Sequence, residues 1–295
     1  MQTARVTYEL SGTGIWNAAL RYGDPGAAAE AAAELESLGY SAIWLPDVGG
    51  DLFPALENVL GATSRTTVAT GILNLWMHTP AETAEAYTRM TAEHGRRLLV
   101  GIGVSHGPFI DMVKPGEYQK PVAKTESYLD ELDQQSPTVP ADDRVLAALG
   151  PKMLALAGAK AAGTHPYNVV PEHTAAAREA LGPGKLVAPE QAVVLETDPD
   201  KARAIARSFL ATYLALPNYA NNWFRFGLTP DDTLDGGTDR LVDALIAWGD
   251  EDAIAARIQA HRDAGADHVC IQVLTDEQVA LTLDGWRRLA PVLCG

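Results

Sequence analysis

Strand-like and helix-like segments alternate along the whole chain, and this alternation limits the fold more than any other feature. The strand-like segments are apolar throughout instead of alternating between apolar and polar residues, which indicates strands buried on both faces. Eight buried strands, each followed by a helical segment, favour a closed (β/α)8 TIM barrel over an open, doubly wound sheet. The predicted strands are 14–20, 41–47, 66–76, 97–104, 144–149, 162–167, 186–196 and 268–274. The predicted helices are 25–39, 53–64, 81–94, 122–133, 152–161, 172–181, 199–216, 251–264 and 277–293.

The length and composition fit one large domain. The chain has 295 residues, of which 47% are hydrophobic, so it can bury a sizeable core. No shift in composition marks a linker. We therefore expect residues 1–295 to form a single barrel domain, with an insertion at 111–124 after the fourth strand.

Charge and hydropathy exclude several classes of function. A net charge of −15 argues against nucleic-acid binding, which needs a basic face. No apolar run reaches the length of a membrane span, and the first 14 residues lack the pattern of a secretory signal. Cys270 and Cys294 are expected to be free thiols. These features predict a cytoplasmic protein.

In a TIM barrel, functional residues lie at the carboxyl ends of the strands. Three of the six tryptophans fall at the ends of the first three predicted strands, and such large flat side chains suit a flat ring ligand. Titratable and small residues occupy the same ends. The candidates are Trp16, Asn17, Trp44, Asp47, Gly71, Asn74, Trp76, His78, Gly103, Ser105, His106, the segment 150–153, His165, Tyr167 and Glu190.

Each of these candidates also has a purely structural interpretation. A tryptophan near a strand end can be a core plug, Asp47 can cap the next helix, and Thr79 is expected to be an N-cap. Gly101 and Gly103 remove side chains where a ring could lie close to the backbone. They are no dinucleotide fingerprint, because the rest of the G-x-G-x-x-G pattern is missing.

The segment 144–173 carries the strongest local signal for an anion site. Pro151 stands at the first position of a predicted helix, where its missing N–H costs nothing. The N–H groups of Lys152, Met153 and Leu154 are then expected to be free and to form a phosphate cradle beside the Lys152 side chain. A well-capped surface helix is the alternative.

Other chemistries have weaker support in the sequence. The seven histidines include no H-E-x-x-H, so we expect no metal site. A metal-dependent hydrolase is an alternative only if His165, His173 and a carboxylate converge. There is no G-x-S-x-G motif, and the adjacent residues Ser105 and His106 cannot easily form a nucleophile–base pair.

Four segments together resemble the luciferase-like monooxygenase superfamily. They are GILNLWMHTPAE (71–82), GIGVSHGPF (101–109), ALGPKMLALA (148–157) and THPYNVVPEHT (164–174). Within the superfamily, the chain is most similar to the branch of coenzyme F420-dependent oxidoreductases of the actinobacterial type. The resemblance extends from about residue 14 to residue 289, and GPKML and HPY-x-x-x-PEHT are its most specific parts.

The resemblance implies a luciferase-like barrel that holds the deazaflavin in its mouth. It implies a non-prolyl cis peptide in a bulge of the third strand, at Gly71–Ile72, behind the ring. The residues implied to line the ring and its ribityl chain are Asp47, Asn74, Val104 and Ser105. The residues implied to hold the phosphate are Gly150, Pro151, Lys152 and Met153, and those implied to flank the tail are Thr164 and His165.

The implied function is hydride transfer between coenzyme F420 and an unidentified, uncharged organic substrate. Asp47, His106 and His78 are the candidates for proton transfer, with His106 or Asp47 preferred. An FMN-dependent monooxygenase and a non-catalytic, coenzyme-binding barrel stay open as alternatives. We also expect a homodimer. The insertion at 111–124 and the aromatic stretch at 216–232 are candidate lid or dimer surfaces, although the second could equally pack against the last helices.

Overall fold

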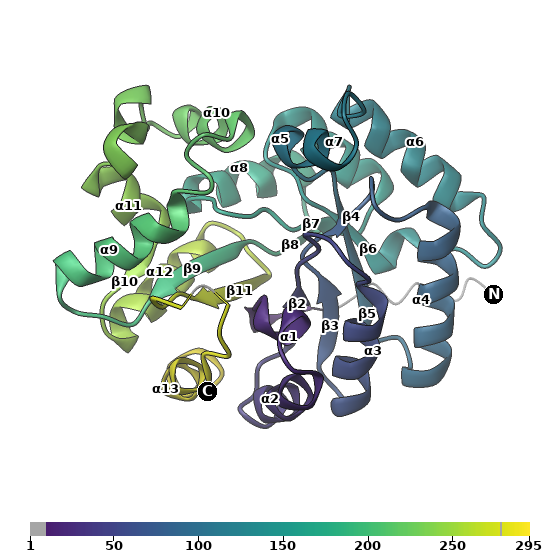
Figure 1. The fold of residues 1–295 in the computed structure, drawn as a ribbon, viewed down its shortest axis with the longest axis horizontal. Coiled ribbons are helices and arrows are strands. Elements are labelled where there is room, and N and C mark those ends of the chain that lie inside the picture. The colour runs from purple at the N-terminus through teal and green to yellow at the C-terminus, as the bar shows by residue number, and fades with distance from the viewer. Residues whose placement is uncertain (1–9, 278) are drawn as a thin grey trace.

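The computed structural model describes residues 10–277 and 279–295. Its centre is a parallel sheet that curls into a barrel and is surrounded by helices (Figure 1). The first fourteen residues, whose pattern argues against a secretory signal, lie mostly outside the described part. The strands are β1 (Gly12–Trp16), β2 (Ala42–Leu45), β3 (Thr67–Thr70), β4 (Leu73–Asn74), β5 (Leu98–Gly103), β6 (Arg144–Leu146), β7 (Gly163–Thr164), β8 (Leu186–Val187), β9 (Glu190–Val194), β10 (Ala247–Trp248) and β11 (His268–Val273).

The barrel closes through the extended segment 186–194, which contains β8 and β9. β8 pairs with β7, whereas β9 pairs with β11, and β11 pairs with β1. Between the two strands, the N–H of Ala188 donates to Thr164 O (3.0 Å) and the carbonyl of Pro189 accepts from Cys270 N (3.0 Å). The segment therefore joins the two sides of the sheet, and the predicted (β/α)8 arrangement is confirmed.

The eight predicted strands are all present, two of them in two pieces. The third is split into β3 and β4 around residues 71–72, and the seventh into β8 and β9 around Pro189. β10 was not predicted; it extends the sheet on the other side of β9. Every described strand pair is parallel, as the continuous apolar strand segments indicate.

Most helices begin on a proline, which fits the first helical turn because no N–H is needed there. Thr79 forms the predicted N-cap, in a capping box with Glu82. The α-helices are α1 (Ala19–Tyr22), α2 (Pro25–Ser37), α3 (Phe53–Ala62), α4 (Pro80–His94), α5 (Gly107–Val113), α6 (Pro121–Asp133), α7 (Pro151–Lys160), α8 (Pro171–Leu181), α9 (Pro199–Leu210), α10 (Pro217–Arg225), α11 (Asp239–Leu245), α12 (Glu251–Asp263) and α13 (Leu283–Leu293); the 3-10 helices are η1 (Ala141–Asp143) and η2 (Pro230–Gly236).

Two helix boundaries differ from the prediction, and the connection after β5 contains a helix that was not predicted. The helix predicted at 199–216 ends at Leu210, and a separate helix begins at Pro217, whose missing N–H suits a first helical position. The last helix begins at Leu283 instead of residue 277. The insertion after β5 contains the short helix α5, which its glycines, prolines and lysines concealed.

A small cluster of side chains fills the inside of the barrel, and a larger core lies between the sheet and the helices. Trp44 is fully buried in the inner cluster and stacks on His165 with ring centres 4.0 Å apart. Trp44 is therefore a core residue, as the structural interpretation of the strand-end tryptophans allows. Trp16 and Trp76 are each 8% exposed.

Among the described residues, no helix is both long and apolar enough to cross a membrane.

Candidate active site

The split of the third strand creates the expected bulge at the barrel mouth. The Gly71–Ile72 peptide is cis. The Trp16 indole donates a hydrogen bond to Gly71 O (2.8 Å), and a Cβ at residue 71 would lie only 2.8 Å from that ring. Glycine is therefore required at this position so that Trp16 can pack against the bulge.

Gly101 and Gly103 make room for residues of this bulge, and they leave no empty space for a ligand ring. A Cβ at Gly101 would meet Thr70 O at 2.1 Å, and one at Gly103 would meet the Ile72 side chain at 2.7 Å. The expectation that these glycines let a ligand ring approach the backbone is thus corrected: the neighbouring strand occupies that space.

Asp47, which follows β2, joins three parts of the mouth. One carboxylate oxygen accepts from Arg21 (2.8 Å), and the other accepts from Asn74 N (2.9 Å) and lies 3.0 Å from His78 Nε2. The carboxylate is fully buried. Asp47 therefore ties α1, the third-strand bulge and the start of α4 together, and it does not cap α3, whose N-cap is Leu52.

The charge state of Asp47 follows from these contacts. Burial acts to raise its pKa, but hydrogen bonds from His78 and Asn74 N, together with the positive charge of Arg21, outweigh burial and lower the pKa. Asp47 is therefore an ionised acceptor that orients His78. An ionised carboxylate can accept a proton but has none to donate, so Asp47 stays a candidate for proton transfer only as an acceptor. The His78 ring that it orients also packs on Phe53.

Asn74 has an unused hydrogen-bond donor at the same place. Its side chain is fully buried, and its Oδ1 accepts from Trp76 N (3.1 Å). Its Nδ2 has no hydrogen-bond partner within the described residues. A buried donor without a partner is costly, so the group is suited to a ligand atom.

The end of β5 supplies the neighbouring wall. The Val104 carbonyl accepts from the Trp76 indole (2.9 Å), and Ser105 follows in the left-handed region at φ 55°. His106 faces away from the Asp47 group, toward α10, where it lies 3.4 Å from the Asn218 amide. Burial lowers the pKa of His106, so its imidazole is neutral at pH 7. Of the three titratable candidates, Asp47 and His78 therefore lie together, whereas His106 lies apart from them.

The phosphate cradle at the start of α7 is smaller than predicted. The N–H groups of Met153 and Leu154 both donate to Gly150 O, at 3.1 and 3.0 Å, and so are not free. Lys152 N makes no hydrogen bond within the described residues, and the Lys152 side chain is exposed. Pro151 contributes only its position at the start of the helix.

Arg225, at the end of α10, was missed by the sequence analysis. Its guanidinium lies 3.5 Å from where a Cβ of Gly150 would be, and no carboxylate within the described residues pairs with it. It adds a positive charge to the cradle. The only sequence signal was a single arginine inside an aromatic stretch. Arg21 and Lys160 are engaged elsewhere, Arg21 with Asp47 and Lys160 with Asp130.

Thr164 and His165 lie inside the barrel, which corrects their expected place beside a cofactor tail. Both are fully buried. The Thr164 hydroxyl donates to Leu146 O (2.8 Å), and His165 Nδ1 lies 2.7 Å from Ala188 O. Thr164 is held against β6 by its hydroxyl, and His165 stacks on Trp44.

α10 covers the side of the mouth opposite the bulge. Its buried residues are Tyr219, Asn222 and Trp223. The Trp223 indole donates to Asn168 O (3.0 Å), and Tyr219 lies 5.3 Å from the His106 ring between centres. The aromatic stretch therefore packs inward as a cover for the strand ends.

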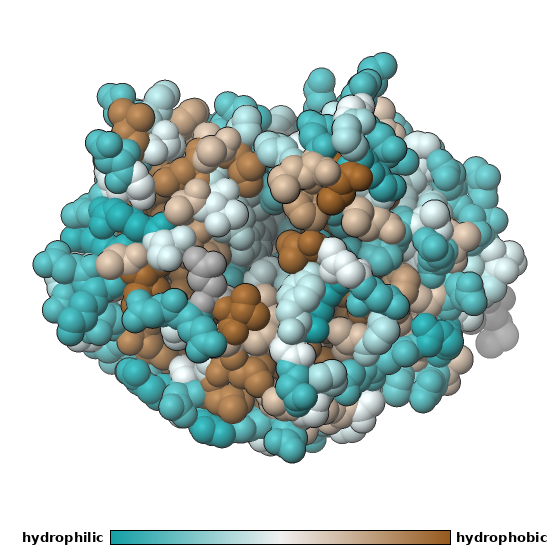
Figure 2. Space-filling model, in the orientation of Figure 1, coloured by the Kyte–Doolittle hydropathy of each residue, from teal (hydrophilic) through white to brown (hydrophobic). Residues whose placement is uncertain are grey.

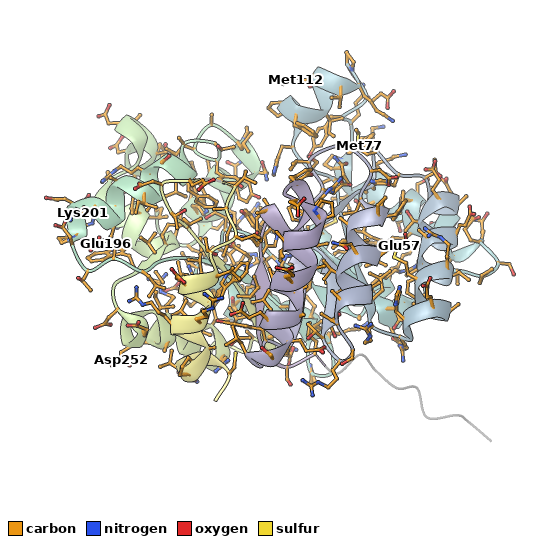
Figure 3. The ribbon with its side chains drawn as sticks, turned by 60° about the horizontal axis from the view of Figure 1, so that its bottom comes forward. Glu57, Met77, Met112, Glu196, Lys201 and Asp252 are labelled. Atoms are coloured by element: carbon orange, nitrogen blue, oxygen red, sulfur yellow. The ribbon has the colours of Figure 1, made fainter. Side chains whose placement is uncertain are left out.

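A group of tyrosines lies beneath α10. Tyr167, after β7, donates from its hydroxyl to Gln272 Oε1 (2.7 Å) and lies 3.1 Å from the Tyr213 hydroxyl. Its ring also contacts Trp16, with centres 5.4 Å apart. Figure 2 shows a hollow on the face that carries α5 and α10, bordered by apolar and neutral side chains. Met112 on α5 points away from the molecule and is 82% exposed (Figure 3).

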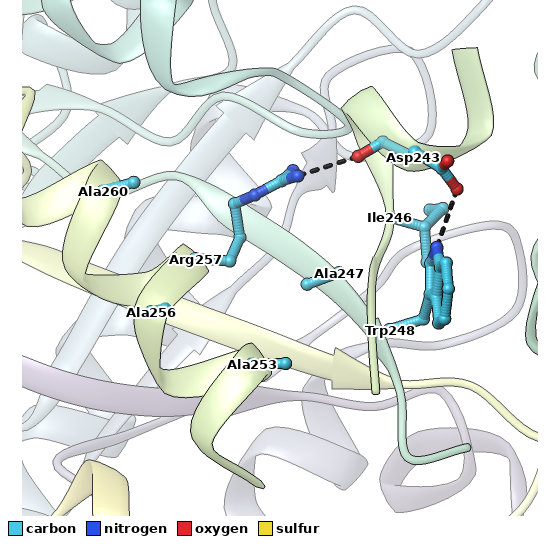
Figure 4. Close-up of a pocket in the computed structure, with 8 residues that line it drawn as sticks. All are labelled: Asp243, Ile246, Ala247, Trp248, Ala253, Ala256, Arg257 and Ala260. Atoms are coloured by element: carbon cyan, nitrogen blue, oxygen red, sulfur yellow. Dashed lines mark hydrogen bonds between the residues drawn. The ribbon is translucent and has the colours of Figure 1, made fainter. Parts of the chain in front are cut away.

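A separate groove of about 330 Å³ lies outside the barrel, between α11, β10 and α12 (Figure 4). Its arginine, Arg257, donates to the carbonyls of Asp243 (2.8 Å) and Ala244 (2.7 Å) at the end of α11. That contact is a helix C-terminal cap. None of the candidate site residues lines this groove. Within the described residues there is also no group of three or more side chains that could hold a metal ion.

Comparisons with known proteins agree with the fold. Residues 10–138 match the family model of the luciferase-like monooxygenases. An F420-dependent tetrahydromethanopterin reductase from Methanopyrus kandleri shares the fold with a TM-score of 0.75 at 17% identity, over 96% of this chain and 98% of that chain. A comparison with curated proteins finds no significant match.

Two further structures show how broad the likeness is. An F420-dependent secondary alcohol dehydrogenase, bound to an F420–acetone adduct, has a TM-score of 0.72 at 16% identity, over 96% of this chain and 99% of that one. The oxygenating component of 3,6-diketocamphane monooxygenase from Pseudomonas putida, bound to FMN, has a TM-score of 0.66 at 13% identity, over 97% and 98%. The resemblance to the luciferase-like monooxygenases is confirmed for residues 10–138 by the family model, and the solved structures share the fold of nearly the whole chain.

Proposed function

From the luciferase-like fold of the whole chain and the family match over residues 10–138, we propose that this protein is an oxidoreductase that uses coenzyme F420. It transfers a hydride between the deazaflavin and an uncharged organic substrate. The observation that carries this proposal is the buried side-chain amide of Asn74, whose Nδ2 has no partner within the described residues, next to the ionised Asp47 that accepts from the Asn74 N–H.

The donor set fits a flat ring with a phosphate tail. Ile72, Asn74, Val104 and Ser105 would hold the ring, and the cradle of Gly150 and Lys152, with Arg225, would hold the phosphate. β4, β5 and β6 are neighbours in the sheet, so both parts share one edge of the mouth. When bound, the deazaflavin supplies a carbon that donates or accepts a hydride.

The chain's own contribution is binding, orientation, water exclusion and proton handling. Asp47 holds the His78 ring by its Nε2, so the other ring nitrogen can take up or release a proton. Tyr219 and Trp223 shield the opposite side of the mouth from water. The neutral His106 is the alternative proton acceptor from the α10 side.

Site-directed variants test this assignment. We expect Asn74→Leu and Lys152→Ala to weaken the binding of oxidised F420 by about tenfold each, because each removes a hydrogen bond or charge to the cofactor. Lys201→Ala, on the exposed face of α9 (Figure 3), is the matched control and should bind as the wild type does. Equal affinity in all four proteins, measured by fluorescence titration, would contradict the proposed site.

The second candidate is an FMN-dependent monooxygenase. It is favoured by the diketocamphane component, which has the same fold and binds FMN. The cradle at α7 would accept the FMN phosphate by the same charges. Selective binding of FMN would move the assignment to this alternative, whereas binding of neither coenzyme would support a non-catalytic barrel.

A further inference from the structure

Glu190, the first residue of β9, is a buried acid that the proposed hydride transfer does not use. Its side chain is fully buried in the barrel interior. One carboxyl oxygen accepts from Asn168 N (3.1 Å), and the other, Oε1, has no partner within the described residues. Half of this carboxyl is therefore unused in the interior.

Asn168 presents further unused groups beside Glu190. Its backbone is fixed at both ends, because its N–H donates to Glu190 and its carbonyl accepts from Trp223. Its side chain is 3% exposed, and neither amide atom has a hydrogen-bond partner in the described part of the chain. Asn222, on the buried face of α10, likewise has two unpartnered amide atoms.

The groups that face Glu190 are all neutral. They are Tyr167 after β7, Tyr213 after α9, Tyr219 on α10 and Cys270 on β11. No cation pairs with Glu190 among the described residues. Burial raises the pKa of Glu190 to about 8, against a smaller opposing effect of the Asn168 N–H. The carboxyl is therefore neutral at pH 7, with its proton on the oxygen that accepts no bond.

The geometry points to Glu190 and Asn168 as a subsite, beneath α10, for an uncharged oxygen group of the substrate. This assignment rests on the proposed function and adds the substrate class, an alcohol or carbonyl compound. Glu190 offers one donor, and the Asn168 amide offers donors and an acceptor, which together match a hydroxyl or a carbonyl. These atoms are buried in the structure, so a ligand reaches them only if α10, which packs on Asn168, moves outward.

Charge explains why the group bound there is uncharged. A carboxylate would lose its hydration without meeting a cation. An alkylammonium ion would find no counter-charge beside the neutral carboxyl at pH 7, and it could form an ion pair only where Glu190 has released its proton to solvent. The two cases differ in pH dependence: the affinity for a neutral ligand falls as Glu190 ionises above pH 8, whereas the affinity for an amine does not.

The test uses four probes with one ring: cyclohexanol, cyclohexanone, cyclohexanecarboxylate and cyclohexylamine. Their dissociation constants are measured by saturation-transfer NMR on the apo-protein at pH 7 and pH 9. Glu190→Gln keeps a donor, and Glu190→Leu removes it. Asn168→Gly removes the amide while keeping the backbone at its φ of 58°. Glu179→Gln, exposed on α8, is the control.

We expect the alcohol and the ketone to bind at least tenfold more tightly than the two ions. Glu190→Leu and Asn168→Gly should each weaken this binding about tenfold, whereas Glu190→Gln should preserve it and abolish the weakening at pH 9. Unchanged affinity in Glu190→Leu, or tighter binding of either ion at pH 7, would overturn the assignment and leave only buried waters at these atoms. F420 titration of the same variants separates this outcome from failure of the coenzyme assignment, because the subsite variants should bind F420 normally.

Discussion

At the residue scale, the mouth depends on a few buried polar side chains, each with one defined task. Asp47 is ionised because Arg21, His78 and Asn74 N surround its carboxylate. Glu190 is neutral because its carboxyl is surrounded only by a backbone N–H and by hydroxyl and thiol groups, and by no cation. The same chemical group therefore takes opposite charge states within one barrel, and its environment decides which.

Asp47→Asn should destabilise the fold as well as the site. The substitution leaves the buried Arg21 without its carboxylate, and removing one partner of a buried ion pair costs about 3 kcal/mol. Urea unfolding monitored by tryptophan fluorescence measures this loss. Asp51→Asn, in the exposed loop that follows, should unfold as the wild type does. A stability equal to the wild type would show that Arg21 and Asp47 are not coupled.

Glu190→Gln should flatten the pH dependence of stability above neutrality. The folded-state pKa of Glu190, about 8, lies above the unfolded value, so its contribution is full at acidic pH and is lost as pH rises toward 8. The wild type should lose about 1.4 kcal/mol per pH unit from this group across that window. Urea unfolding at several pH values between 6 and 9 compares the two proteins. Parallel curves would contradict the raised pKa.

At the element scale, local signals in the sequence predicted some parts of the site and non-local packing decided others. The start of α7 and the Thr79 cap could be predicted, because proline and capping residues act within one turn. The anion cradle was overestimated, because two N–H groups turn back to Gly150. The role of α10 could not be predicted from the sequence, because it depends on contacts with Asn168 and His106, which are distant in sequence.

Arg225→Ala should weaken F420 binding about tenfold, since α10 brings this charge to the start of α7. The effect should shrink as salt is raised, because exposed charges are screened. Arg65→Ala, also exposed but before β3, is the matched control. A salt-independent or absent effect in fluorescence titration would show that α10 does not take part in phosphate binding.

At the scale of the whole molecule, the barrel was predictable from the continuous apolar strands, but its filling was not. Two histidines, His165 and His268, lie with Trp44 inside the barrel. Another two, His173 and His261, lie buried on α8 and α12. A histidine within a helix or strand pattern gives no sequence signal of its burial, since the same residue type is common at the surface.

These four histidines predict acid sensitivity. Burial lowers the pKa of His165 and His173 to about 4 and of His261 and His268 to about 3. Their contribution is full above the unfolded-state value near 6.5 and is lost as pH falls toward 4, at about 1.4 kcal/mol per pH unit for each. With Glu190 acting in the opposite sense, stability should be greatest near pH 6.5. Urea unfolding from pH 5 to 8 measures this, and an undiminished stability at pH 5 would contradict it.

The central claim is that the mouth binds a deazaflavin, and a parallel titration of the wild-type apo-protein with oxidised coenzyme F420 and with FMN tests it most directly. Fluorescence reports both. We predict saturable, micromolar binding of F420 and at least tenfold weaker binding of FMN. Tight binding of FMN alone, or of neither coenzyme, would contradict the account.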